Sequence, residues 1–208
     1  MRLDWESLSR FSVASTSDQT DYRKYPYIAG NIFAATLPEQ AGVWSYPVAS
    51  PGSIGVVYEP SEDYIENNIS AERVTMNMVN AILGRVHLAS RIDLLNGELL
   101  RLVKEGVDYY NSLTDIKKKA YPYLPLGFAR YGDSVVACGL KYLNKIYLAV
   151  WNLKGENKAI IPINEKVISV KVGYPMQLET KYSFNNGKLT VHFNEITARL
   201  FEIELLRE

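Results

Sequence analysis

Five consecutive polar residues, Ser17-Asp18-Gln19-Thr20-Asp21, carry the side chains most capable of chemistry in this sequence. The run follows a strand-like segment at residues 11–14 and precedes a helix-like segment at residues 22–35. In a parallel α/β fold, the loops that leave the carboxyl ends of the strands form the catalytic edge. A carboxyl shielded from water at that edge can keep its proton near neutral pH and give it to a leaving oxygen as a general acid.

Ser17 and Asp21 leave other interpretations of this run open. Asp21 lies one helical turn after Asp18 and could help to hold the proton there, or it could be the N-cap of the following helix. Ser and Asp are both favoured at helix N-caps, so capping alone would also explain the run.

The composition argues against several classes of function. Lys plus Arg and Asp plus Glu both number 23, so the formal charge is zero and no basic field would attract nucleic acid or an anionic membrane. The single cysteine, Cys138, excludes an internal disulfide, and its apolar neighbours predict a buried side chain. His87 and His192 lack partners at metal-ligand spacing, so we expect no metal and no cofactor. Without a long apolar run or a signal peptide, the chain is predicted to be cytoplasmic.

The first 125 residues alternate between strand-like and helix-like patterns. Further strands are predicted at residues 41–47 and 86–89, and further helices at residues 70–84 and 97–119. This alternation requires parallel pairing of the strands with helical crossovers. The lysines at residues 117–119 complement the negative end of the last helix, and we expect a solvated cap there, not a phosphate site.

The helical period disappears beyond the Pro-rich and Gly-rich stretch at residues 121–127. Short apolar runs follow, separated by turns of which Asn186-Gly187 is the sharpest hairpin signal. The predicted strands lie at residues 134–142, 145–153, 158–163, 167–172, 182–184, 188–193 and 197–205. They predict an antiparallel β-sandwich, which divides the chain into domains at residues 1–125 and 126–208.

The order of several motifs resembles that of the retaining α-galactosidases that hydrolyse melibiose and raffinose, and the resemblance covers essentially the whole chain. It rests on Arg2-Leu3-Asp4, Ser17-Asp18-Gln19-Thr20-Asp21, Gln40-Ala41-Gly42-Val43-Trp44-Ser45-Tyr46-Pro47, Asn77-Met78-Val79-Asn80 with Leu83-Gly84-Arg85-Val86-His87-Leu88, and Tyr147-Leu148-Ala149-Val150-Trp151. It implies an α/β plus all-β fold, in which the last strands and helices of a (β/α)8 barrel are followed by an antiparallel β-sandwich domain.

The same resemblance implies roles for individual residues. Asp18 would be the general acid/base, Arg2 and Ser17 would bind substrate, and the substrate would be an α-galactoside oligosaccharide. The nucleophile of that family is an Asp in a Lys-x-Asp setting, and no Lys-x-Asp occurs in this sequence. We therefore expect a C-terminal portion that carries one of the two catalytic carboxyls, is inactive alone and has the missing N-terminal part of the enzyme as a possible partner.

Two alternatives differ in their chemistry. The chain could be a non-catalytic carbohydrate-binding or interaction module, with aromatic side chains such as Trp151, Tyr142, Tyr147 and Tyr182 stacked on sugar rings. Strand alternation turns about half of these inward, and Trp151 is expected in the core. The chain could also belong to a related glycosidase that acts on α-N-acetylgalactosaminides or another α-glycoside.

Overall fold

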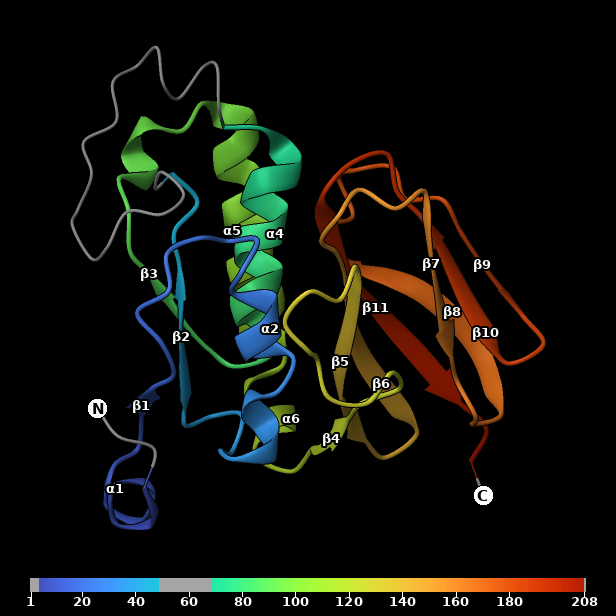
Figure 1. The fold of residues 1–208 in the computed structure, drawn as a ribbon, viewed down its shortest axis with the longest axis horizontal. Helices are drawn as coiled ribbons and strands as arrows, with labels where there is room; N and C mark the ends of the chain where they lie inside the picture. The colour runs from blue at the N-terminus through green and yellow to red at the C-terminus, as the bar shows by residue number, and fades with distance from the viewer. Residues whose placement is uncertain (1–3, 49–68, 208) are drawn as a thin grey trace.

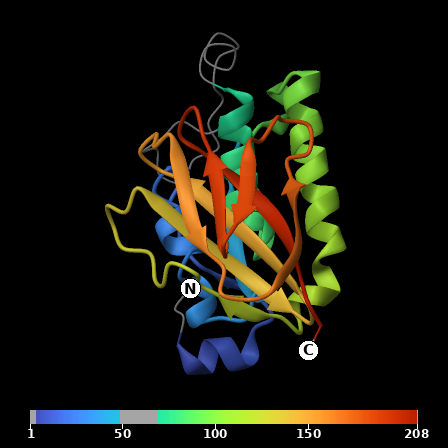
Figure 2. The same cartoon turned by 90° about the vertical axis from the view of Figure 1, so that its right-hand side faces the viewer.

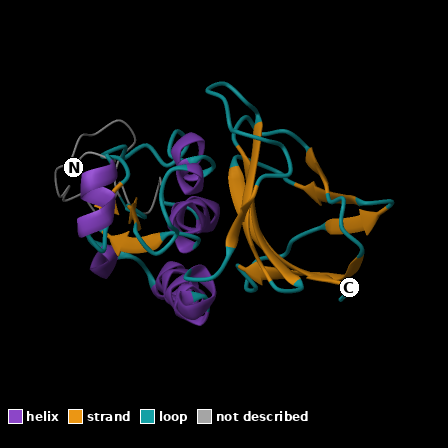
Figure 3. Cartoon of the chain, turned by 90° about the horizontal axis from the view of Figure 1, so that it is seen from below, coloured by secondary structure: helices purple, strands orange, loops and turns teal. Residues whose placement is uncertain are grey.

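The computed structural model describes residues 4–48 and 69–207 and is built of successive layers (Figures 1 and 3). A parallel sheet lies on one side of a layer of helices, and two antiparallel sheets lie on the other side. Arg2, which the sequence marks as a substrate-binding candidate, falls outside the described residues.

The parallel sheet contains β1 (Ala14–Ser15), β2 (Ala41–Ser45) and β3 (Arg85–Leu88) in the order β1-β2-β3. Both neighbouring pairs run parallel, as the alternation of strands and helices predicts. The first strand begins later than the predicted run at residues 11–14, because Phe11 and Ser12 are exposed and the ladder starts where the Ala14 N–H bonds to Gln40 O.

The segment predicted as a helix at residues 22–35 is divided into two short pieces, α2 (Pro26–Ala29) and the 3-10 turn η1 (Ile32–Ala34). Pro26 occupies the first helical turn, where a proline is tolerated because its missing N–H would be unpaired in any case. Another short helix, α1 (Trp5–Arg10), begins at Asp4, whose carboxylate accepts a hydrogen bond from the Ser7 N–H. None of its residues is buried.

The long helices α4 (Ala71–Ile82) and α5 (Gly97–Ser112) begin at the caps that the sequence predicts. Ser70 Oγ accepts from the Arg73 N–H, and Asn96 Oδ1 accepts from two N–H groups at the start of α5. Helix α4 is buried along almost its whole length because it packs between the parallel sheet and the antiparallel sheets. The 3-10 turn η2 (Ile92–Leu94) connects β3 to α5.

The helix predicted at residues 97–119 ends instead at Ser112 and is followed by the separate turn α6 (Thr114–Lys117). The expected solvated lysine cap is wrong for one of its members, because Lys117 is only 3% exposed. Its ammonium donates to Gly84 O at 2.8 Å and lies 3.8 Å from the centre of the Tyr110 ring. Burial lowers the pKa of Lys117 to about 7.

Two antiparallel sheets form a sandwich, with strand orders β4-β5-β6-β11-β8 and β7-β10-β9. In Figure 2 the three-stranded sheet lies in front of the five-stranded one. Each of the seven predicted strands is present: β5 (Val135–Tyr142), β6 (Lys145–Asn152), β7 (Lys158–Pro162), β8 (Val167–Tyr174), β9 (Tyr182–Asn185), β10 (Lys188–His192) and β11 (Thr197–Leu205). The edge strand β4 (Tyr121–Tyr123) was not predicted; it precedes the expected boundary after residue 125 and pairs with β5.

The five-stranded sheet is covered on both faces. Along β6, Ile146, Leu148 and Val150 belong to the core shared with the three-stranded sheet, and the alternate residues pack toward the helices. The helix-facing residues include Trp151, which is 1% exposed, and Tyr147, which is 5% exposed. These two rings therefore form part of the core, and the idea that they stack on sugar is wrong for them.

Candidate functional site

The carboxyl edge of the parallel sheet brings together the residues that directly follow β1, β2 and β3. Asp18 lies three residues beyond the end of β1, on the expected edge, and its side chain is exposed. From the sequence we expect the Asp18 carboxyl to be shielded from water. The described part of the chain does not shield it fully, because the Asp18 side chain is exposed.

Residues just before Asp18 are fixed to β2. The Thr16 N–H bonds to Gly42 O at 3.1 Å, and Thr16 Oγ1 donates to the same oxygen at 2.9 Å. The hydroxyl of Tyr25, which is 1% exposed, lies 2.9 Å from Thr16 Oγ1. The end of β1 is therefore locked between the neighbouring strand and the start of α2, and Asp18 projects from a held backbone.

A series of side-chain hydrogen bonds shapes the loop itself. Ser17 Oγ accepts from the Gln19 N–H at 3.0 Å, and Gln19 Oε1 accepts from the Asp21 N–H at 2.9 Å. Asp21 Oδ1 in turn accepts from the backbone and Nε of Arg23. In this structure Ser17 orders the loop, and its substrate contact stays a prediction.

Asp21 has a structural role in the described residues. It is 3% exposed, and its carboxylate pairs with Arg23 at 3.1 Å and with Lys24 at 3.9 Å. Its backbone oxygen accepts from the N–H groups of Lys24 and Tyr25. Asp21 therefore organises the turn that leads into α2, whose own N-cap is Tyr25.

An aromatic cluster that the sequence did not mark as a site lies beside this loop. The Trp44 ring is 5.0 Å from His87 and 6.4 Å from Tyr46, measured between centroids, and Trp44 Nε1 donates to Ser15 Oγ at 3.2 Å. Burial, the neighbouring Tyr25 and the charge of Asp18 all raise the pKa of Tyr46. Asp18 thus lies within electrostatic range of the cluster. The sequence signals for the cluster were the aromatic run at residues 40–47 and the block at residues 83–88, which support the resemblance but were not marked as a site.

The two faces of β2 differ in burial. On the helix-facing side, Ala41, Val43 and Ser45 are buried, whereas Trp44 and His87 on the opposite face are only half-buried. Gly42 permits close packing on this opposite face, because a Cβ there would lie only 3.0 Å from Ala14 O and 3.0 Å from Val13 Cγ2. A half-open sheet face with aromatic and basic groups therefore adjoins Asp18.

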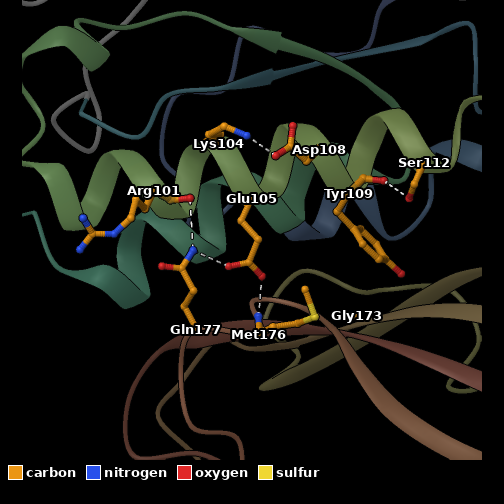
Figure 4. Close-up of a pocket in the computed structure, with 9 residues that line it drawn as sticks. All are labelled: Arg101, Lys104, Glu105, Asp108, Tyr109, Ser112, Gly173, Met176 and Gln177. Carbon is orange, nitrogen blue, oxygen red and sulfur yellow. Dashed lines mark hydrogen bonds and ion pairs between the residues drawn. The ribbon is translucent and has the colours of Figure 1, made fainter.

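A separate hollow of about 490 Å³ lies between α5 and the turn after β8 (Figure 4). Glu105 bridges its two walls by accepting from the Met176 N–H at 2.5 Å and from Gln177 Nε2 at 2.7 Å. Tyr109 donates to Glu202 at 3.0 Å, and burial together with Glu202 raises the pKa of Tyr109. These polar groups join the helix to the sandwich, so the hollow lies at the junction between them.

Within residues 4–48 and 69–207, no group of three or more His, Cys, Asp or Glu side chains is arranged to hold a metal ion. In the same ranges no helix is long and apolar enough to cross a membrane.

Comparison with solved structures gives the fold a clear counterpart. The galactosidase domain of the α-galactosidase-sucrose kinase AgaSK is 13% identical with a TM-score of 0.60, over 91% of this chain and 25% of that one. The GH36 α-galactosidase AgaA of Geobacillus stearothermophilus, solved with raffinose, is 10% identical with a TM-score of 0.58, over 90% and 25%. An Anoxybacillus α-amylase is 10% identical with a TM-score of 0.54, over 88% and 46%.

This chain has the fold of the C-terminal region of GH36 α-galactosidases. It spans about a quarter of the length of the two α-galactosidases. At these identities the likeness concerns the fold alone. No family model and no curated protein matches the sequence.

Proposed function

We propose that this chain is the C-terminal portion of a retaining α-galactosidase. Residues 1–125 would supply the last strands and helices of a (β/α)8 barrel, and residues 126–208 would form its C-terminal β-sandwich domain. The main support is the position of Asp18, which projects from a fixed backbone at the carboxyl edge of three parallel strands, in a fold whose solved counterparts include several α-galactosidases.

Asp18 would act as the general acid/base. Retention requires two carboxyl groups about 5–5.5 Å apart, one of which attacks the anomeric carbon while the other protonates the departing oxygen. Asp18 would give its proton to that oxygen and then take a proton from the water that hydrolyses the glycosyl-enzyme. The nucleophile would come from the missing N-terminal part of the enzyme, which we propose as the partner of this chain.

The half-open sheet face is the expected surface for that partner. Trp44, Arg85 and His87 would be covered by the remaining barrel, and the sugar together with those strands would shield Asp18 from water. Trp44 and Tyr46 offer aromatic rings to the apolar face of a sugar. Arg2 and Ser17 are proposed to contact its hydroxyls. The substrate class is a terminal α-galactosyl group of an oligosaccharide, consistent with the raffinose bound in AgaA.

A different α-glycoside is the second candidate, because the α-amylase counterpart shares the fold at a similar level. Parallel assays with aryl α-galactoside, α-glucoside and α-N-acetylgalactosaminide would separate these substrates.

The first experiment is to assay the 208-residue chain alone on an aryl α-galactoside. We expect no turnover, because half of the catalytic pair is missing. Turnover that Asp18→Asn abolishes would reveal a nucleophile within the chain and contradict the proposal. The second is to read the DNA upstream of the Met1 codon, where a reading frame for a Gly-rich segment and a Lys-x-Asp strand would support it.

A further inference from the structure

The loop that carries Asp18 is hydrogen-bonded to helix α4. Asn80, which is 4% exposed, donates from Nδ2 to Tyr22 O at 3.0 Å. Tyr22 directly follows Asp21, and its ring also lies 5.2 Å from the Arg73 guanidinium of the same helix. The far end of the loop, four residues beyond Asp18, is therefore held by α4.

The side chain of Asn80 is in turn oriented by the sandwich. The Nε1–H of Trp151, in β6, donates to Asn80 Oδ1 at 2.8 Å, and this indole is 1% exposed. An indole N–H can only donate, so it requires the oxygen of the amide and directs the NH₂ group toward the loop. The contact thereby selects the amide orientation that can reach Tyr22 O.

We infer that Trp151 is a positioning residue for Asp18, acting through Asn80. The inference rests on the proposed function, because it assigns the sandwich a part in holding the general acid/base. Trp151, which lies 133 positions after Asp18 in the sequence, thus connects the sandwich to the loop of Asp18. The connection runs through hydrogen bonds from β6 to Asn80 of α4 and from Asn80 to Tyr22.

Docking of the sandwich does not depend on Trp151 alone. Arg199 in β11 pairs with Glu72 of α4, and Tyr174 in β8 donates to Leu102 O of α5 at 3.1 Å. Removing only the indole N–H should therefore leave the layers assembled and act on the loop. This separation makes the inference testable.

The test compares Trp151→Phe with Tyr174→Phe in the full chain. Both substitutions remove one buried hydrogen bond between the sandwich and a helix, and only the bond of Trp151 leads to the loop. Trp151→Phe also removes part of a buried ring, whereas Tyr174→Phe removes only a hydroxyl, so Asn80→Leu is needed to separate the lost hydrogen bond from the lost packing. We expect hydrogen exchange of the Lys24 and Tyr25 amides to become at least tenfold faster in Trp151→Phe than in Tyr174→Phe. Equal exchange in the two variants would overturn the inference.

Asn80→Leu provides a second variant, because it keeps the branched shape of the side chain and removes the donor to Tyr22 O. It should accelerate the same amides as Trp151→Phe does. Acceleration in Asn80→Leu without any in Trp151→Phe would confine the effect to Asn80 and overturn the role of Trp151.

In the completed enzyme, Trp151→Phe should lower kcat about tenfold with KM unchanged, because the acid is misplaced while the sugar contacts remain. A rise in KM alone would contradict positioning. If Trp151→Phe accelerates amide exchange in the loop but Asp18→Asn keeps full activity, the proposed function is rejected while the coupling between Trp151 and the loop stands. The two failures are therefore distinguishable.

Discussion

The ion pair between Arg199 and Glu72 offers a quantitative test of how the sandwich is attached to the helices. Arg199 binds both Glu72 oxygens, through Nη1 at 2.6 Å and Nη2 at 2.7 Å, and donates from Nε to Thr180 at 2.8 Å. The Arg199 side chain is 6% exposed and that of Glu72 is 22% exposed. We predict that Arg199→Met strongly destabilises the protein, because it leaves a carboxylate largely buried without its cation.

The expected loss follows from the burial of the pair. Removing one partner of a buried ion pair costs about 3–5 kcal/mol. For a protein of this size, that corresponds to a fall in Tm of about 6–20 °C. The loss should be smaller when Glu72 is also replaced by Leu, since no unpaired charge then stays behind.

The pH dependence of this loss has a definite sign. Burial alone would raise the pKa of Glu72, but the hydrogen bonds and charge of Arg199 outweigh it and lower that pKa below its usual value of 4.5. The stability from the pair is therefore present above about pH 4.5 and is lost as the pH falls through the lowered folded-state pKa. Arg199→Met should be most costly near pH 7 and less costly near pH 3.

The assay is urea unfolding of the wild type, both single variants and the double variant at pH 7 and at acid pH. A coupling free energy of at least about 2 kcal/mol at pH 7 that shrinks in acid is the expected result. A loss below about 1 kcal/mol with no pH dependence would refute the reasoning, because it would class the pair with exposed ion pairs.

Three further predictions follow from other sites. Burial lowers the pKa of Lys117 to about 7, so between pH 7 and about 10.5 the unfolded chain binds more protons than the folded chain. The stability of the wild type, measured by thermal unfolding, should therefore rise with pH across that window. Lys117→Met should not show this rise. Gly42→Ala should cost about 1–3 kcal/mol, since its Cβ would press on Ala14 O and Val13; an unchanged Tm would contradict the close packing. Asp18→Asn should change the free energy of unfolding by less than about 0.5 kcal/mol, whereas Asp21→Asn should lower it by more than about 1 kcal/mol, because Asp21 is buried and paired with Arg23. Equal losses in urea unfolding would contradict a structural role for Asp21 alone.

Strands in the sandwich were predictable because they form short apolar runs separated by recognisable turns, either alternating in burial as in β7 or buried on both faces as in β6. Asn186 and Gly187 both adopt positive φ, as the hairpin between β9 and β10 requires. Helices α4 and α5 were predictable from their caps, Ser70 and Asn96. The edge strand β4 was missed because its proline signals a break, although an edge strand can tolerate one.

Side-chain environment was harder to predict than backbone structure. Lys117 was assigned to solvent because it belongs to a lysine run that complements the negative end of a predicted helix, yet Gly84 O and the Tyr110 ring surround its ammonium. The position of Asp18 beyond β1 followed from the order of strand and helix. Its exposure, and the Trp44 cluster beside it, depend on contacts between strands that are distant in sequence.

The central claim is most directly tested by the leaving-group dependence of Asp18→Asn in the enzyme completed by the upstream polypeptide. A general acid matters for a poor leaving group such as an alkyl alcohol and little for dinitrophenolate, which departs without protonation. We predict that kcat/KM falls about 10²–10⁴-fold for an oligosaccharide and changes little for dinitrophenyl α-galactoside. An equal loss for both substrates, or no loss for either, would contradict the assignment of Asp18 as the proton donor.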